Sequence, residues 1–151
     1  MRSVIVLDAA ALVDAVLDQP TAAWVLDEIA EQEVCAPAHQ PAEVLSALAR
    51  LVRAAQIDLE SARDALDEAV ALPQRFVTPT TGHLRLAFTL RERMRVVDGL
   101  YVALAGELHC ALVTTDRRLA IADAPCEIRI PPAQPGHPTG VPVPVPRPAD
   151  S

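Results

Sequence analysis

Short apolar runs alternate with longer stretches of helical periodicity along most of the chain. The apolar runs are rich in Val, Ile and Leu, and they predict strands at 3–7, 33–36, 76–78, 111–114 and 127–130. Apolar residues at helical spacing predict helices at 9–17, 21–29, 41–52, 59–72, 81–93, 98–108 and 117–122, with Thr21 and Asp58 as N-caps. This alternation is typical of an α/β protein, so we expect three layers, with a short central parallel sheet flanked by helices.

The composition changes after Ile130. Residues 131–151 hold eight of the 14 prolines, including the run Val141-Pro-Val-Pro-Val-Pro-Arg-Pro. Such a segment cannot bury enough apolar surface to form a core. We therefore expect one folded domain at 1–130 and a proline-rich, extended or disordered tail at 131–151. A solvated tail is a better interpretation than a docking peptide for a proline-binding partner.

The overall composition fits a folded cytoplasmic domain. Of 151 residues, 51% are hydrophobic and only 3% aromatic, so Ala, Leu and Val must build the core. Cys35, Cys110 and Cys126 lack the spacing of a zinc site and fit buried thiols in a reducing compartment. The apolar N-terminus meets Asp8 too early for a signal peptide, and no apolar run is long enough to span a membrane, so no membrane partner is expected.

The basic residues exclude several mechanisms and suggest one. All 13 are arginine, which excludes phosphate-binding loops, Schiff bases and receiver domains, because these need a lysine. The net charge of -7 is unlike that of a nonspecific nucleic-acid binder, but arginines gather between positions 85 and 118. Arg93, Arg95 and Arg117 are therefore candidates for binding an RNA backbone, although an ordinary surface role is commoner for any one of them.

Four acids, Asp8, Glu43, Asp98 and Asp116, stand next to the ends of predicted elements. Asp8 and Asp116 follow strands, whereas Glu43 and Asp98 lie in the first turns of helices. In a parallel sheet these ends meet at one edge, where α/β proteins place their ligand crevices. Each acid alone is more typical of a helix cap, but the joint arrangement indicates a shared catalytic site.

Carboxylates that crowd together repel one another, and a hard divalent cation relieves the repulsion. Mg²⁺ prefers such oxygen ligands, and Mn²⁺ is also compatible with them. A carboxylate-held metal suits phosphodiester hydrolysis, because it lowers the pKa of a bound water and neutralises charge on the scissile phosphate. The sequence leaves open whether one metal ion is bound or two.

Three motifs resemble the PIN-domain family, and closely the VapC-like toxins of bacterial type II toxin–antitoxin pairs. They are Val6-Leu-Asp8-Ala-Ala-Ala-Leu-Val, Pro41-Ala-Glu43-Val-Leu-Ser-Ala-Leu, and Asp98-Gly-Leu-Tyr-Val-Ala-Leu-Ala-Gly-Glu-Leu followed by Leu112-Val-Thr-Thr-Asp116-Arg-Arg-Leu-Ala. The order and spacing of the acids match over residues 1 to about 130. The resemblance implies a PIN-like fold and a toxic Mg²⁺- or Mn²⁺-dependent endoribonuclease that hydrolyses RNA with a water nucleophile.

The resemblance also implies roles and partners. Asp8 and Asp98 would be the surest metal ligands, Glu43 and Asp116 would complete the acidic site, and Thr114 would lie near the metal. A small VapB-like antitoxin would wrap the toxin and block the site, and the toxin would form a homodimer.

Two departures from the family pattern keep an alternative open. Ala10 stands where Ser, Thr or Asn is common, and Gly99 stands where Ala is usual and should slightly weaken the start of its helix. The alternative is a PIN-like module with little or no catalysis that mainly binds its antitoxin. A haloacid-dehalogenase-type phosphatase is disfavoured, because it would need a second aspartate at position 10.

Overall fold

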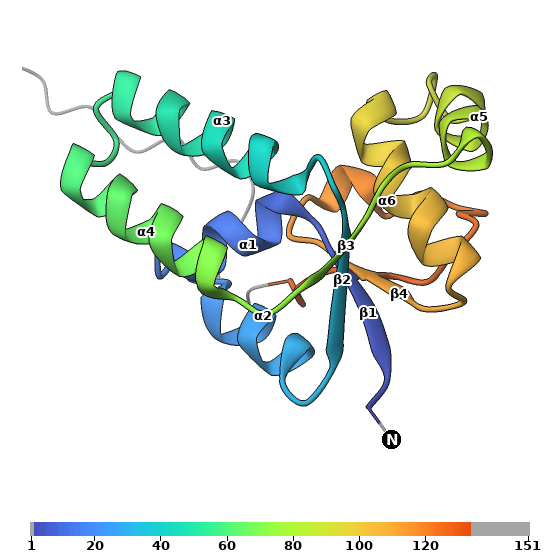
Figure 1. The fold of residues 1–151 in the computed structure, drawn as a ribbon, viewed down its shortest axis with the longest axis horizontal. Helices are drawn as coiled ribbons and strands as arrows, with labels where there is room; N and C mark the ends of the chain where they lie inside the picture. The colour runs from blue at the N-terminus through green and yellow to red at the C-terminus, as the bar shows by residue number, and fades with distance from the viewer. Residues whose placement is uncertain (1, 134–151) are drawn as a thin grey trace, which may run out of the picture.

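A five-stranded parallel sheet lies between two layers of helices in the computed structural model, which describes residues 2–133 (Figure 1). The strands are β1 (Val4–Leu7), β2 (Glu33–Pro37), β3 (Arg75–Val77), β4 (Ala111–Val113) and β5 (Ile128–Arg129), in the order β3-β2-β1-β4-β5. The helices are α1 (Ala9–Val16), α2 (Ala22–Ile29), α3 (Gln40–Arg53), α4 (Leu59–Ala71), α5 (Thr81–Thr89) and α6 (Val96–Glu107), with a 3₁₀ turn at Arg117–Leu119. The expected three-layer α/β fold is confirmed.

Helices cover both faces of the sheet. Ile5 and Leu7 point into the layer formed by α1, α2, α3 and α4, whereas Val6 and Leu112 point toward α5 and α6, as the alternation of side chains along a strand requires. Figure 1 shows α3 and α4 on one side of the sheet and α5 and α6 on the other. The central strands are thus buried on both faces, which explains why they appear in the sequence as continuous apolar runs.

Helices α5 and α6 approach each other closely at Gly99. A Cβ atom added there would lie 2.9 Å from the Cα of Ala87 on α5, closer than packed atoms tolerate. From the sequence, Gly99 is expected only to weaken the start of its helix. The structure shows that it also makes room for the neighbouring helix.

Two local expectations are wrong, although the cap at Asp58 is confirmed by its 2.7 Å bond from the Ser61 amide. Thr21 has helical backbone angles (φ -86°, ψ -6°), so it does not cap α2, and its hydroxyl donates instead to Asp14 Oδ2 at 3.2 Å. Helix α5 ends at Thr89 rather than Arg93, because the chain turns there and buries Leu90 and Met94 in the core. Tertiary burial overrides helix propensity at this turn.

Most of the expected proline-rich tail, residues 134–151, lies outside the described residues. Over the described part, the last strand ends at Arg129, close to the expected domain boundary at residue 130. None of the helices between residues 2 and 133 has both the length and the apolar character needed to cross a lipid bilayer.

Candidate active site

The acids singled out from the sequence line one cavity of about 150 Å³ at the carboxyl edge of the sheet. Asp8 follows β1 and Asp116 lies beyond β4, the strand paired with β1, while Glu43 and Asp98 come from the first turns of α3 and α6. Strand order reverses around β1, and such a switch point is where open α/β sheets form ligand crevices. Residues far apart in the sequence are thereby gathered around one hollow.

Asp8 is the most deeply buried of these acids, with 4% of its surface exposed. It caps α1, since Oδ1 accepts a 2.8 Å bond from the Ala11 amide, and Oδ2 accepts a 2.5 Å bond from the Thr114 hydroxyl. Burial raises the pKa of Asp8 to about 7, with smaller contributions from the charges of Asp98 and Asp116, although both hydrogen bonds oppose the shift. The structure therefore holds Asp8 where its ionised form needs a nearby positive charge.

Thr114 joins two of the acids from beneath the cavity. It is fully buried beside Asp8, because it directly follows β4, which pairs with β1. Its hydroxyl donates to Asp8 and accepts a 3.0 Å bond from the Asp116 amide. Thr114, which the resemblance places near the metal, therefore contacts one of the two proposed principal metal ligands, Asp8.

Glu43 is held by three neighbours from other elements or turns. Its Oε1 accepts a 2.7 Å hydrogen bond from the Tyr101 hydroxyl of α6 and lies 3.1 Å from His39 Nε2, while Oε2 lies 3.6 Å from Arg95. Partial burial raises the pKa of Glu43, but these neighbours outweigh it and the net pKa is lowered. Tyr101 and His39 also pack edge to face, with ring centroids 5.0 Å apart.

Arginines neutralise the two remaining acids. Arg95 donates to both carboxylate oxygens of Asp98, at 3.0 and 3.1 Å. Arg118 does the same for Asp116, at 3.0 and 2.8 Å, and this pairing, opposed by partial burial, lowers the pKa of Asp116. Such two-point contacts are the strong form of the arginine–carboxylate interaction. The cavity therefore has an acidic floor with cations at its edge.

A family model described as PIN domain matches residues 5–125, which is most of the chain. The chain belongs to the PIN domain family. The acids around the cavity all lie within the matched residues, and the resemblance expected from the motifs is confirmed.

Two relatives of this chain carry the name ribonuclease. Ribonuclease VapC1 of Mycobacterium tuberculosis is 39% identical over 127 residues, which cover 83% of this chain and 96% of that protein. Ribonuclease VapC3 of the same species is 37% identical over 124 residues, covering 78% of this chain and 86% of that protein. This chain therefore aligns with nearly the whole of each relative.

Two solved structures share the fold. PAE2754 from Pyrobaculum aerophilum matches with a TM-score of 0.62 at 21% identity, covering 83% of this chain and 83% of that one. VapBC2 from Rickettsia felis, solved bound to a DNA fragment from their promoter, matches with a TM-score of 0.59 at 14% identity, covering 84% of this chain and 98% of that one. At these identities the likeness supports the PIN domain fold alone.

The donor set of this PIN domain cavity fits a divalent cation. Its donors are carboxylate oxygens, and two of the carboxylates, Asp8 and Asp98, are only 4% and 7% exposed. Within residues 2–133, no group of three or more His, Cys, Asp or Glu side chains is placed to hold a metal ion. Mg²⁺ keeps several waters and commonly binds directly to only one or two carboxylates, so two carboxylates with water are a sufficient donor set for it.

The candidate RNA-binding arginines do not gather at the cavity. Arg95 lines it, but Arg93 donates to the Ala122 carbonyl and Arg117 donates to the Pro131 carbonyl at 2.7 Å. Two arginines that were not candidates lie at the site instead. Arg118 forms an ion pair with Asp116, and Arg50 lines the cavity from α3. The signal for Arg50 was available in the sequence, since it lies seven residues after Glu43 on the same helix.

Three other residues contact or support the site, and the sequence carries a weak signal for two of them. Tyr101 lies three residues after Asp98, so the two share a helix face. His39 and Glu43 are spaced as helical neighbours. Gln40 is fully buried and donates to the carbonyl of Leu7 at 3.0 Å, which ties the start of α3 to the end of β1 beside Asp8. Nothing in the sequence distinguishes this glutamine from a surface one.

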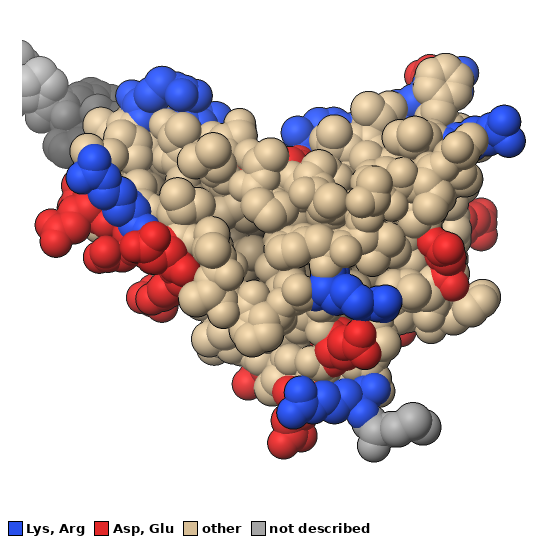
Figure 2. Space-filling model, in the orientation of Figure 1, with Lys and Arg blue, Asp and Glu red and all other residues tan. Residues whose placement is uncertain are grey.

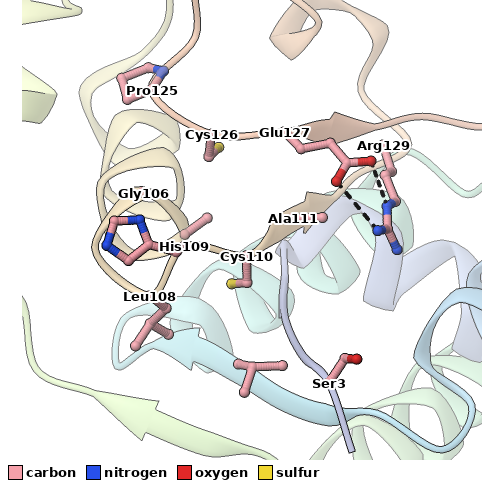
Figure 3. A pocket seen from close by; sticks show the side chains of 12 residues that line it. Ser3, Gly106, Leu108, His109, Cys110, Ala111, Pro125, Cys126, Glu127 and Arg129 are labelled. Carbon is pink, nitrogen blue, oxygen red and sulfur yellow. Dashed lines mark hydrogen bonds and ion pairs between the residues drawn. The ribbon is translucent and has the colours of Figure 1, made fainter.

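A second hollow, of about 460 Å³, lies at the opposite, amino-terminal edge of β1, β4 and β5 (Figure 3). Cys110 and Cys126 line it, and an ion pair between Glu127 and Arg129 spans 3.0 Å on one side. Burial raises the pKa of both thiols, to about 11 for Cys126, so they are weak nucleophiles. The cysteines are free thiols, as expected, and this hollow lacks the acids of the first.

Proposed function

We propose that this chain is a toxic, metal-dependent endoribonuclease of the VapBC type, which hydrolyses RNA phosphodiester bonds. The single observation that carries the proposal is the convergence of Asp8, Glu43, Asp98 and Asp116 on one cavity of a PIN domain. RNA as the substrate class is supported by two relatives that are named ribonucleases and that align with this chain over nearly their whole length. The alternative of a non-catalytic module is not favoured, because every acid of the proposed site is present.

Some residues of the cavity are proposed to bind the metal, and others orient those ligands. Asp8 and Asp98 are the proposed principal ligands of Mg²⁺ or Mn²⁺, with Glu43 and Asp116 completing the site. A bound divalent cation supplies a lowered pKa for the attacking water and positive charge at the scissile phosphate. Thr114 fixes the orientation of Asp8, and Tyr101 fixes that of Glu43. Arg95 and Arg118 lie where they can contact phosphate oxygens once a cation satisfies the acids.

The proposal includes partners. The antitoxin is a VapB-like protein that covers the cavity, and RNA is the substrate. A homodimer is supported by the exposed apolar residues Leu84 and Phe88 on α5, which are 55% and 63% accessible. Surface of this kind on a small domain is typical of an interaction site.

The experiment compares RNA cleavage by the purified parent, Asp98→Asn and Asp67→Asn, each with Mg²⁺, with Mn²⁺ and with EDTA. Asp67 lies on an exposed position of α4, so its variant is the matched control for the same chemical change. Asp98→Asn should lose more than about a hundredfold in rate, because even groups that only support metal ligands contribute about 10–100-fold. The parent and the control should cleave RNA with metal and stop with EDTA.

Expression in cells gives a second readout. The parent and Asp67→Asn should inhibit growth, and Asp98→Asn should not, while thermal unfolding shows that all three are folded. Cleavage by Asp98→Asn at the parental rate, or cleavage by the parent that EDTA leaves unchanged, would contradict the proposal.

A further inference from the structure

One wall of the cavity is a face of α3. Glu43, Ser46, Ala47 and Arg50 all line the hollow, and their spacing of three and four residues places them on one face of the helix. With a rise of 1.5 Å per residue, the backbone at Arg50 lies about 10 Å beyond that at Glu43. This wall therefore leads from an acid of the proposed metal site to a cation at its outer end.

Arg50 differs from the other arginines near the site in having no acid to neutralise. Arg95 contacts Asp98 and Glu43, and Arg118 contacts Asp116. The side chain of Arg50 is exposed and makes no ion pair or hydrogen bond with any residue between 2 and 133. Its guanidinium donors are thus available for a ligand that enters the cavity.

The charge of the molecule favours the use of such a cation in binding an anionic strand. The net charge is -7, and the floor of the cavity is acidic, so a phosphate backbone is repelled except where local cations oppose it. Figure 2 shows the hollow between the α3 side and the α5–α6 side, with basic atoms on both flanks and acidic atoms between them. A strand lying in this hollow meets cations before and after the acids.

We propose that Arg50 binds a non-scissile phosphate of single-stranded RNA, one or more linkages along the strand from the phosphate held at the acids. This inference rests on the proposed ribonuclease function and adds a substrate-binding residue to it. A single strand is the proposed form, because its backbone is free to bring one phosphate to the acids and another to Arg50.

The first test compares Arg50→Gln with Arg53→Gln. Arg53 lies on the same helix and is also exposed, but it does not line the cavity, so it controls for the loss of one charge. The probe is a single-stranded RNA oligonucleotide that the parent cleaves at one place. Arg50→Gln should raise KM about two- to fivefold at low salt with kcat unchanged, the size of one exposed ionic contact. In a non-cleaving Asp98→Asn background, the salt dependence of binding should fall by about 0.7 in logarithmic slope, as for one lost phosphate contact.

The second test replaces single phosphates of the same RNA by uncharged methylphosphonates. At one non-scissile linkage, the neutral group should weaken cleavage by the parent as much as Arg50→Gln does, and it should cost Arg50→Gln nothing further. Such non-additivity is expected only if the side chain and that phosphate contact each other. Arg53→Gln should retain the parental response at every linkage.

The outcomes separate this inference from the function on which it rests. Cleavage by the parent, with Arg50→Gln and Arg53→Gln indistinguishable or with additive losses at every linkage, overturns the role of Arg50 and leaves the ribonuclease. An effect of Arg50→Gln on inhibition by the antitoxin alone, with RNA binding intact, overturns it in favour of a partner carboxylate. Absence of cleavage by the parent overturns both proposals.

Discussion

At the scale of single residues, Asp8 shows the conflict between holding a carboxylate rigidly and keeping it charged. Both of its carboxylate oxygens accept hydrogen bonds, one from the Ala11 amide and one from the Thr114 hydroxyl, and only 4% of its surface is exposed. Burial raises its pKa to about 7. Ionising this buried carboxylate at neutral pH lowers the stability of the metal-free protein, and a bound cation would offset that cost.

The variant Asp8→Asn should therefore stabilise the metal-free protein, and more so as pH rises. The folded pKa of about 7 lies above the ordinary value of 3.8, so the folded state holds this proton more tightly than the unfolded chain does. The resulting stability is full below about pH 4 and is lost progressively as pH rises to 7, on the order of a few kcal/mol in all. Asparagine keeps the helix cap without a charge.

Urea unfolding of parent and variant between pH 5 and pH 8, with EDTA present, measures this effect. The difference between their free energies of unfolding should widen from pH 5 to about pH 7 and then level off. Added Mg²⁺ should stabilise the parent more than Asp8→Asn. A difference that does not change with pH would contradict the elevated pKa of Asp8.

The acids themselves could be found from the sequence, whereas their partners could not. Asp8 and Asp116 stand out because apolar runs mark the strand ends that precede them. The pairing of Arg118 with Asp116, or of Tyr101 with Glu43, depends on side-chain directions that only the packed structure fixes. For the same reason Arg93 and Arg117, chosen by proximity in the chain, bind backbone carbonyls instead.

At the scale of elements, strands were easier to predict than the ends of helices. A strand such as β4 is buried on both faces and leaves a continuous apolar run, but the end of α5 depends on burying Leu90 and Met94. The close crossing of α5 and α6 was likewise invisible, although Gly99 is its residue of contact. Helix propensity alone predicts that Gly99 destabilises its helix, and it does not predict the close contact with α5 that this glycine permits.

Replacing Gly99 by alanine should lower stability, although alanine is the better helix former. The gain in propensity is about 1 kcal/mol, but the new methyl group would lie 2.9 Å from the Cα of Ala87, and overpacking costs about 1–3 kcal/mol. Gly82→Ala on α5 is the matched control, since its nearest neighbour would be Thr80 Oγ1 at 3.7 Å. Thermal unfolding should show a lower Tm for Gly99→Ala and an equal or higher Tm for Gly82→Ala. A stabilised Gly99→Ala would mean that the helices separate without cost.

At the scale of the whole molecule, the acidic hollow and the exposed apolar residues of α5 and α6 are different features. In Figure 2, basic residues flank the hollow, and residues that are neither acidic nor basic cover much of the α5–α6 side. Leu84 and Phe88 on α5 and Val96 at the start of α6 are each at least 49% accessible and form the apolar surface of these helices. The chain thus offers one surface suited to a phosphate strand and another suited to a protein.

A homodimer formed through this apolar surface predicts that Phe88→Glu makes the protein monomeric. Phe88 is 63% exposed on α5, with the Arg91 guanidinium 4.6 Å from its ring centroid, so it can be replaced without opening the core. A carboxylate in the apolar centre of an interface loses its hydration, which destabilises association even with Arg91 beside it. Leu26→Glu on α2, across the sheet, is the matched control at 52% exposure. Light scattering during size-exclusion chromatography, over a dilution series, should report a dimer for the parent and Leu26→Glu and a monomer for Phe88→Glu. A dimeric Phe88→Glu would place the interface elsewhere, and a monomeric parent would remove the dimer from the proposal.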